Sequence, residues 1–567
     1  MKFRGNKVMN STQSVFLRKI VSLILVCLTS ICGISVAAEN ADTILFNGKI
    51  VTVNDQFQVE QAIAVKGQRI LAVGKNENIM KFKGPDTKLL DLKKKTVIPG
   101  LIDNHAHFIR APEHDELRLD NVLSRKDALK LIADRAKSIK PGEWIITIGG
   151  WSRHQFIDDP RGFSMEDLDF VAPNNPVVMQ EVYWRSFLNT RALIELHIDA
   201  NTPDPRGGKI LKNANGKPTG VIEGGGGVAY IAAKLPLPDV DQWRANTLKL
   251  VAEINGMGIT AWYDAGGRGV DEKHYLPYQW LSERGQLNAR AFWSTIRQPM
   301  TPQEVDVVLQ EIARQKPFQG NDYFDNIGWG ETTYAPFTTT LTRNDFKVKP
   351  EELVEVRRII RAIADRGLTL NNHVEMTNAI DALLDEYEAL NREKPIKGYR
   401  WVFSHLDQVD EKELRRMQNL GMYAGIHSRP LIQGAQMHEV HNDVAWDMPP
   451  FKRIQDSGII WGLGSDATAV TTSNPFYSLY FAVTGKMING EKVNRQSITR
   501  EQALIAHTRS NAYFIFQEDN LGTLQAGKYA DLLVLDKDYM TVPADQIKGI
   551  KPVATMVGGK FVFKNLN

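Results

Sequence analysis

The sequence predicts an α/β protein: a TIM-type (β/α)8 barrel that carries a small β-sandwich built from both ends of the chain. Two observations predict it. Short apolar strands alternate with amphipathic helices through the middle of the 567 residues, whereas both ends show short strands separated by turns. A chain of this length is too long for one compact core, so at least two domains are expected.

The barrel prediction rests on the strand–helix rhythm between residues 350 and 466. A helix is predicted from Pro350 to Arg366, because apolar residues recur three and four apart and Gly367 follows as its stop. Further strands are predicted at 368–373, 400–405, 422–427 and 459–466, separated by helices at 379–390, 411–420 and 451–457. These strands end at His or Asp, and reactive groups of such barrels stand at the carboxyl ends of the strands.

The two ends of the chain show antiparallel patterns. Two hairpins are predicted early, from 43–46 with 49–53 and from 62–65 with 69–73, and strands of the same style return at 531–535, 554–557 and 560–563. We therefore predict a composite β-sandwich from residues 39–98 and 516–567, and a barrel domain at 99–515. Residues 119–237 fit the barrel rhythm poorly and are predicted to be an insertion that shapes the pocket mouth.

Residues 1–38 have the pattern of a secretory signal peptide. Basic residues precede an apolar run over 20–38 that ends in small residues, and no acidic residue occurs before Glu39. We expect cleavage, export and a periplasmic location, with no stable membrane insertion afterwards. The alternative is an uncleaved anchor, because the apolar run is nearly long enough to span a bilayer.

Charge and cysteine content exclude several classes of function. The chain has 69 basic and 66 acidic residues, but five of the basic ones lie in the expected signal peptide. The remainder is near neutral and gives no argument for nucleic acid binding. Both cysteines, Cys27 and Cys32, also lie there, which excludes disulfides and cysteine metal ligands from the rest. We expect the partner to be a small-molecule substrate. The sequence leaves open whether the chain forms a homo-oligomer.

The stretch 97–108 predicts a buried strand that ends at two histidines. Side chains two residues apart in a strand point to the same face, so His105 and His107 project together. Two converging imidazoles form half of a site for a divalent ion such as zinc. The H-x-H pattern alone leaves an alternative, in which the two histidines lie in a loop and form hydrogen bonds with the backbone and with water.

Other strand ends supply His373, His405 and Asp466. Four imidazoles and one carboxylate suit a borderline divalent ion that activates a water molecule. The carboxylate could take the proton from that water and pass it to the leaving group. Any one of these histidines alone would more often be a structural core residue.

Four motifs carry a resemblance to a known family: residues 97–107, 258–260, 464–466 and 522–532. With them the chain resembles the amidohydrolase superfamily from Asp42 to Phe563, specifically the amidohydrolase-3 branch that includes the N-substituted formamide deformylases. The resemblance implies a barrel enclosed by a small β domain. It also implies a metal-dependent hydrolase acting on carbon–nitrogen bonds other than peptide bonds.

The resemblance further implies that His105 and His107 bind a buried metal and that His373 and His405 bind a second. Asp466 would be both ligand and general base. Many relatives bridge the two metals with a carbamylated lysine, but residues 323–333 contain no lysine. Glu331 is the candidate bridge, with an ion-paired or surface glutamate as the alternative, and Glu223 is a weaker candidate. We expect a divalent metal, with zinc favoured, as one or two ions.

Two departures from the family pattern concern the pocket: Val374-Glu375-Met376-Thr377 after the strand-end histidine, and Ser404 before His405. Candidate pocket residues are Trp151, Arg153, His154, Trp184, Arg185, His427 and Arg429. Aromatic walls with arginine would suit an aromatic or acidic substrate, whereas exposed Arg and buried Trp are also common structural residues.

These observations predict a secreted metal-dependent hydrolase that cleaves an amide-type C–N bond of a small molecule through a metal-activated water. A lactone or ester hydrolase, or a deaminase, would use the same site. A binding protein that retains the fold without turnover is a third alternative.

Overall fold

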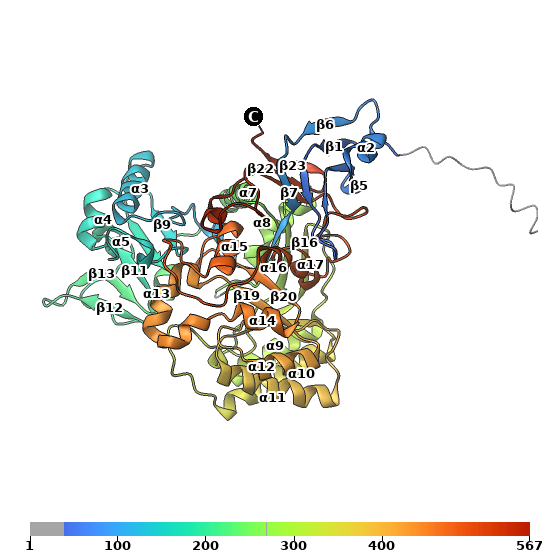
Figure 1. Cartoon of the computed structure of the whole chain (residues 1–567). Helices are drawn as coiled ribbons and strands as arrows, with labels where there is room; N and C mark the ends of the chain where they lie inside the picture. Colours follow the sequence, from blue (N-terminus) through green and yellow to red (C-terminus); the bar gives the residue numbers. More distant parts are fainter. Residues whose placement is uncertain (1–38, 268, 567) are drawn as a thin grey trace, which may run out of the picture.

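The computed structural model describes residues 39–267 and 269–566 (Figure 1). At its centre, eight parallel strands follow one another in the order in which they occur in the chain. They are β8 (Leu101–Ala106), β14 (Ile259–Asp264), β15 (Arg290–Thr295), β16 (Phe324–Glu331), β17 (Thr369–Val374), β18 (Val402–His405), β19 (Tyr423–His427) and β20 (Trp461–Gly464). The predicted TIM-type barrel is confirmed.

The first and last strands approach each other and nearly close the barrel. The backbone N–H of Asp466, just after β20, donates to the carbonyl of His105 at 2.8 Å. The side chain of Asp103 in β8 also accepts a hydrogen bond from the N–H of Ser465, at 3.0 Å. The ends of all eight strands therefore face one common space.

Helices follow the strands and cover the barrel. They are α7 (Val240–Met257), α8 (Glu272–Glu283), α9 (Pro302–Arg314), α10 (Pro350–Asp365), α11 (Thr377–Glu393), α12 (Glu411–Leu420), α13 (Pro430–His441), α14 (Phe451–Ser457), α15 (Pro475–Thr484), α16 (Arg500–Ala506) and α17 (Arg509–Phe514). Helix α12 shows why the boundaries were predictable. Asp410 accepts from the N–H of Glu413 in a capping box, and Gly421 ends the helix at a φ of +69°.

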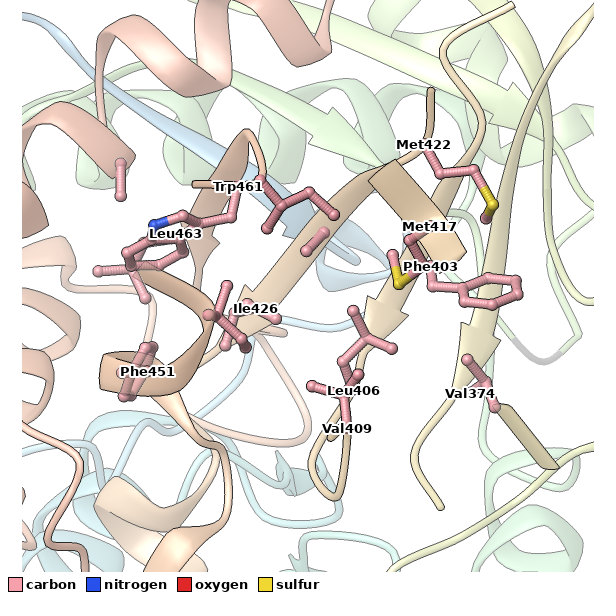
Figure 2. Close-up of a cluster of buried hydrophobic side chains, with 14 of the residues drawn as sticks. Val374, Phe403, Leu406, Val409, Met417, Met422, Ile426, Phe451, Trp461 and Leu463 are labelled. Atoms are coloured by element: carbon pink, nitrogen blue, oxygen red, sulfur yellow. The ribbon is translucent and has the colours of Figure 1, made fainter. Parts of the chain in front are cut away.

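The largest apolar core lies between the later barrel strands and their helices (Figure 2). Phe403 of β18 lies beside Met417 of α12, and Phe451 of α14 lies against Trp461 of β20 with ring centroids 5.9 Å apart. This packing leaves the strand ends, rather than the strand middles, for polar side chains.

The two ends of the chain meet in one six-stranded sheet, visible in Figure 1 as blue and dark red strands side by side. Its order is β23 (Lys560–Lys564), β22 (Pro552–Val557), β21 (Leu532–Leu535), β7 (Thr96–Pro99), β2 (Lys49–Val51) and β3 (Val59–Glu60). A four-stranded sheet accompanies it, in the order β5 (Arg69–Gly74), β4 (Ala62–Lys66), β1 (Thr43–Phe46) and β6 (Lys88–Asp91).

The first predicted hairpin is wrong. Strands β1 and β2 follow each other across Asn47-Gly48, yet β1 pairs with β4 and β6, whereas β2 pairs with β3 and β7. The two strands thus enter different sheets, and each pairs with strands that lie further along the chain. The second predicted hairpin, β4 with β5, is antiparallel as expected.

A buried ion pair joins the barrel to the six-stranded sheet. Arg290 of β15 donates two hydrogen bonds to Asp531, from Nε at 2.8 Å and from Nη2 at 3.1 Å. Its guanidinium carbon lies 4.1 Å from the ring centroid of Tyr529 and 4.5 Å from that of Tyr323. With side chains 1% and 4% exposed, this pair has almost no contact with water.

Between β8 and β14 the chain builds a separate five-stranded sheet, seen at the left of Figure 1. Its order is β12 (Lys209–Lys212), β13 (Pro218–Glu223), β11 (Arg185–Leu188), β10 (Val177–Glu181) and β9 (Ile145–Ile148). Helices α3 (Arg125–Ser138), α4 (Met165–Val171), α5 (Thr190–Glu195) and α6 (Gly225–Ala232) accompany it. Of these, α6 leads the chain back to the barrel.

No helix within residues 39–267 and 269–566 is long and apolar enough to cross a membrane. The expected signal peptide, and with it the alternative of a membrane anchor, lies outside the described residues.

Candidate metal centre

Seven of the predicted site residues stand at or just beyond the carboxyl ends of barrel strands. His105 is in β8, Glu331 ends β16, His373 is in β17 and His405 ends β18, while His427 ends β19. His107 and Asp466 follow β8 and β20 directly. Since parallel strands end at the same edge of a barrel, these side chains converge although they are spread over 362 positions of sequence.

Glu331 lies at the centre of the cluster. Its Oε2 atom is 3.2 Å from Nε2 of His105, 3.5 Å from Nδ1 of His373 and 3.7 Å from Nε2 of His405. One carboxylate oxygen therefore faces imidazoles from three different strands.

Asp466 occupies the other side of the cluster. Its Oδ1 is 3.0 Å from Nε2 of His107, and its Oδ2 is 3.7 Å from Nδ1 of His405. The other ring nitrogen of His107, Nδ1, donates to the carbonyl of Gly266 at 2.9 Å. Such a backbone contact fixes the tautomer and turns the lone pair of Nε2 toward the cluster.

The buried polar atoms of the cluster fit a metal ion. Nε2 of His105, Nε2 of His405, Nε2 of His427 and Oε2 of Glu331 are all buried without a hydrogen-bond partner among the described residues. Buried polar atoms are nearly always paired, and an ion is one of the recognised explanations for exceptions. These are imidazole and carboxylate donors, which suit a borderline divalent ion.

Three ligand groups have donor atoms within 4.8 Å of one another. They are His105, His107 and Glu331; then Glu331, His373 and His405; and finally His105, His405 and His427. Glu331 belongs to two of the groups, which is the arrangement a carboxylate bridge between two ions requires. Glu223 lies elsewhere: it is 3.6 Å from Nη1 of Arg185 and does not approach the cluster.

The protonation of two histidines favours metal binding. Burial, followed by the nearby charge of His373, lowers the pKa of His405 to about 3. Burial and the neighbouring His105 hold the pKa of His427 well below its usual value. Both imidazoles are therefore neutral at physiological pH, the form that binds a metal.

The raised pKa values of two other histidines, His107 and His373, show that the cluster attracts positive charge. Burial acts to lower the pKa of His107, but contact with Asp466 and then the charge of Glu331 raise it to about 10. For His373, burial is likewise outweighed by Glu331 and Glu375, and the pKa rises to about 10. The buried carboxylates thus draw cations toward them, and a divalent ion meets the same requirement.

Behind the cluster, Arg429 is paired with buried carboxylates. Its Nη1 donates to Oε1 of Glu375 at 2.6 Å and lies 3.7 Å from Oδ2 of Asp407, while its Nε is 3.5 Å from Oδ2 of Asp466. Burial acts to raise the pKa of Glu375, but the Arg429 guanidinium holds it well below its usual range.

A cavity of about 350 Å³ opens beside the cluster. Its lining includes His107, Glu331, His373, His405 and Asp466 on one side, and Tyr183, Gln298, Thr338, Thr339, Thr340, Arg343, Glu375 and Arg429 around the rest. A cavity of this volume is within the range of small-molecule sites.

Four of the predicted pocket residues do not line this cavity, and that part of the prediction is corrected. Trp151 is fully buried in the core of the five-stranded sheet, stacked on Phe156 at 5.7 Å. Arg153 bonds through its backbone to Glu181, Arg185 faces Glu181 and Glu223, and the indole N–H of Trp184 points to Gln433.

The histidines predicted for the pocket are also placed differently. His427 belongs to the metal cluster, with Nδ1 2.9 Å from Nδ1 of His405. His154 lies 4.0 Å from Glu439 and has no place in the cavity wall. Of the predicted pocket residues, Arg429 lines the cavity.

Tyr183 lines the cavity, but the sequence did not point to it. Its neighbour Trp184 was the predicted pocket residue. Tyr183 stands in the loop between β10 and β11, where Val182 has a φ of +46°. This turn decides which side chain faces the barrel, and the two aromatic neighbours give no signal to choose between them.

The family model for the amidohydrolase family matches residues 88–563 of the chain. The chain belongs to the amidohydrolase family. It is 26% identical over 550 residues to the N-substituted formamide deformylase of Arthrobacter pascens, covering 91% of this chain and 97% of that protein. The predicted branch is therefore confirmed, and this amidohydrolase is an enzyme that hydrolyses C–N bonds.

Solved structures share the fold of this amidohydrolase. A metal-dependent hydrolase from Pyrococcus horikoshii superposes with a TM-score of 0.63 at 19% identity, covering 88% of this chain and 99% of that one. An adenosine deaminase from Xanthomonas campestris with bound zinc gives 0.52 at 14% identity, covering 93% and 94%. Family membership and the donor set together support a divalent metal at the centre of this amidohydrolase.

Proposed function

We propose that this amidohydrolase cleaves an amide-type C–N bond of a small molecule at the cluster of His105, His107, Glu331, His373, His405 and Asp466. The observation that carries the proposal is the convergence of three imidazoles on one oxygen of Glu331, beside a cavity that can hold a small substrate. The Arthrobacter relative is an N-substituted formamide deformylase, and deformylation of such amides is a reaction of this class.

We assign His105 and His107 as the residues that would hold one ion, and His373 and His405 as those that would hold a second, with Glu331 within reach of both groups. Zinc is our choice, because it is commonly bound by imidazole and carboxylate groups. A bound ion would supply Lewis acidity, which lowers the pKa of a water molecule and polarises a carbonyl group.

Asp466 would move the proton in this reaction. Burial acts to raise its pKa, but His107, His405 and His105 hold it below the usual value, so the carboxylate is ionised and can accept a proton. It would take one proton from the attacking water and deliver it to the leaving nitrogen as the C–N bond breaks. Arg429, 3.5 Å away, and His107, 3.0 Å away, hold the carboxylate in place.

Metal content and hydrolysis, measured together, test the proposal. We expect the purified enzyme to hold divalent metal and to hydrolyse members of a panel of small amides, esters, lactones and amino-heterocycles. The variant His105→Ala should lose metal and turnover together, because Nε2 of His105 faces both carboxylates of the cluster. Glu331→Ala should lower the number of ions per chain, because its oxygen is shared by two ligand groups.

Two matched controls are available. His438→Ala removes an imidazole that donates to the carbonyl of Val493 and packs edge-on against Trp446, and Glu223→Ala removes a glutamate outside the cluster. Both should keep metal and activity. Bound metal without turnover of any panel compound would leave a binding role in place of catalysis, and unchanged stoichiometry in Glu331→Ala would reject the bridge.

We also propose that the enzyme is exported to the periplasm after cleavage near residue 38. The basic start, the apolar run and the small residues at 36–38 support this. Amino-terminal sequencing of the protein recovered from cells should begin at or near Glu39. A sequence that begins at Met1, in a membrane fraction, would favour the anchored alternative.

A further inference from the structure

We propose that the enzyme selects amides that carry a neutral apolar substituent, and that this substituent lies in a second cavity against helix α6. The inference rests on the proposed amide hydrolysis and names the substrate class of that same site.

The second cavity has a volume of about 370 Å³ and adjoins the metal-centre cavity, since Tyr183 and Gly225 line both. A narrow space lined by His107, Tyr183 and Ala232 lies alongside, so residues of the metal cluster and of α6 share one wall. A substrate whose carbonyl lies at the metal cluster can therefore extend past Tyr183 toward α6.

One face of the second cavity is apolar. It is formed by α6 and the segment that follows: Val228, Ala229, Ala232, Ala233, Leu235 and Leu237. The alanines leave room because their side chains are short, and Leu237 is 61% exposed beside them. An apolar substituent would cover this face and remove it from water, which is the main source of free energy for such ligands.

The rest of the lining forms a polar face, and its charges are already paired with one another. Nε2 of His274 lies 3.2 Å from Oε1 of Glu113, and its Nδ1 lies 2.9 Å from Oδ1 of Asp271. Arg110 faces the same Glu113 at 3.8 Å. Each charged group described on this face thus has a partner of opposite sign, so a charged substituent would gain little and a neutral one is favoured.

The remainder of the first cavity is polar and suits the other end of the substrate. Thr338, Thr339, Thr340 and Arg343 line the first cavity but not the second. The substrate therefore has a small polar part near the threonines, the scissile amide at the metal cluster and an apolar part at α6.

Two substrate series test the inference and show which side of the amide bears the apolar group. One runs from N-methylformamide to N-hexylformamide, and the other from acetamide to octanamide. In at least one series, kcat/KM of the wild-type enzyme should rise about threefold for each added methylene group until the cavity is filled.

The variant Ala229→Trp fills the second cavity and should remove this dependence, lowering kcat/KM for the long members about tenfold or more relative to the shortest member. Leu237 is exposed, so Leu237→Ser should not disturb folding. This variant should reduce the rise in kcat/KM for each added methylene group. As a matched control, Ile194→Trp adds the same indole at a 64% exposed position of α5 and should change nothing.

Binding measured by calorimetry separates failure of this inference from failure of the proposed function. The probes are N-hexylmethanesulfonamide and N-methylmethanesulfonamide, which resist hydrolysis. Tighter binding of the hexyl compound to wild type, lost in Ala229→Trp, supports the apolar site even if no amide is turned over. Equal binding of both probes, or a chain-length dependence that survives Ala229→Trp, would overturn it.

Discussion

Replacing Asp466 by Asn is expected to lower kcat about a thousandfold, within the range attributed to general acid–base catalysis. The carboxylate is fully buried, ionised, and 3.0 Å from Nε2 of His107. The amide has nearly the same shape and keeps an oxygen that can face the metal, but it cannot accept the proton from water. Metal content should therefore stay near the wild-type value while turnover falls. Steady-state kinetics on the best amide of the panel, with metal analysis of the same sample, measure both.

A half-buried aspartate outside the cluster provides the control for this variant. Asp447 is paired with Arg495 at 2.5 Å and belongs to none of the ligand groups, so Asp447→Asn should leave kcat unchanged. If Asp466→Asn retained kcat within about tenfold of wild type, another group would be the base and our assignment would be wrong. Loss of metal in Asp466→Asn would instead make the residue chiefly a ligand.

The second large effect is on stability. We expect Arg290→Met to lower the free energy of unfolding by about 3–5 kcal/mol, the range for breaking a buried ion pair. Arg290 and Asp531 are almost completely buried, and removing the guanidinium leaves a carboxylate with few remaining partners. Denaturant unfolding, followed by tryptophan fluorescence, would show the loss.

A double variant distinguishes the cost of the unpaired charge from the cost of lost packing. Arg290→Met combined with Asp531→Leu removes both charges, and buried pairs replaced in this way often lose little or no stability. We therefore expect the double variant to recover most of the lost stability. If it were as unstable as Arg290→Met, the stacking of the guanidinium between Tyr529 and Tyr323 would be the more important contribution.

The barrel could be predicted because its strands and helices carry local signals. The predicted helix 411–420 coincides with α12, since Asp410 and Gly421 mark its two ends chemically. The early strands gave no such information: β1 and β2 have a turn between them, but their partners lie far along the chain. Pairing between distant strands depends on tertiary packing, which a local pattern does not contain.

The same distinction applies to the site. His105 and His107 were predictable as a pair because of their spacing, and His373, His405 and Asp466 because each lies at or just beyond the carboxyl end of a strand. The pocket residues could not be predicted, because the pocket wall comes from loops and from α6. The orientation of α6 follows from the packing of the five-stranded sheet. Trp151 illustrates the error: a tryptophan after two glycines suggested a pocket wall, but it completes an aromatic core instead.

The sheet that unites both ends of the chain has a consequence for how the molecule is made. Pro99 of β7 pairs with Leu532 of β21, so one edge of β7 must wait for its neighbour until almost the whole chain has left the ribosome. At about 5–20 residues per second, that delay is on the order of tens of seconds. During translation the N-terminal strands of the nascent chain present an unpaired, apolar edge. Chaperones can bind this edge, and it is prone to aggregation.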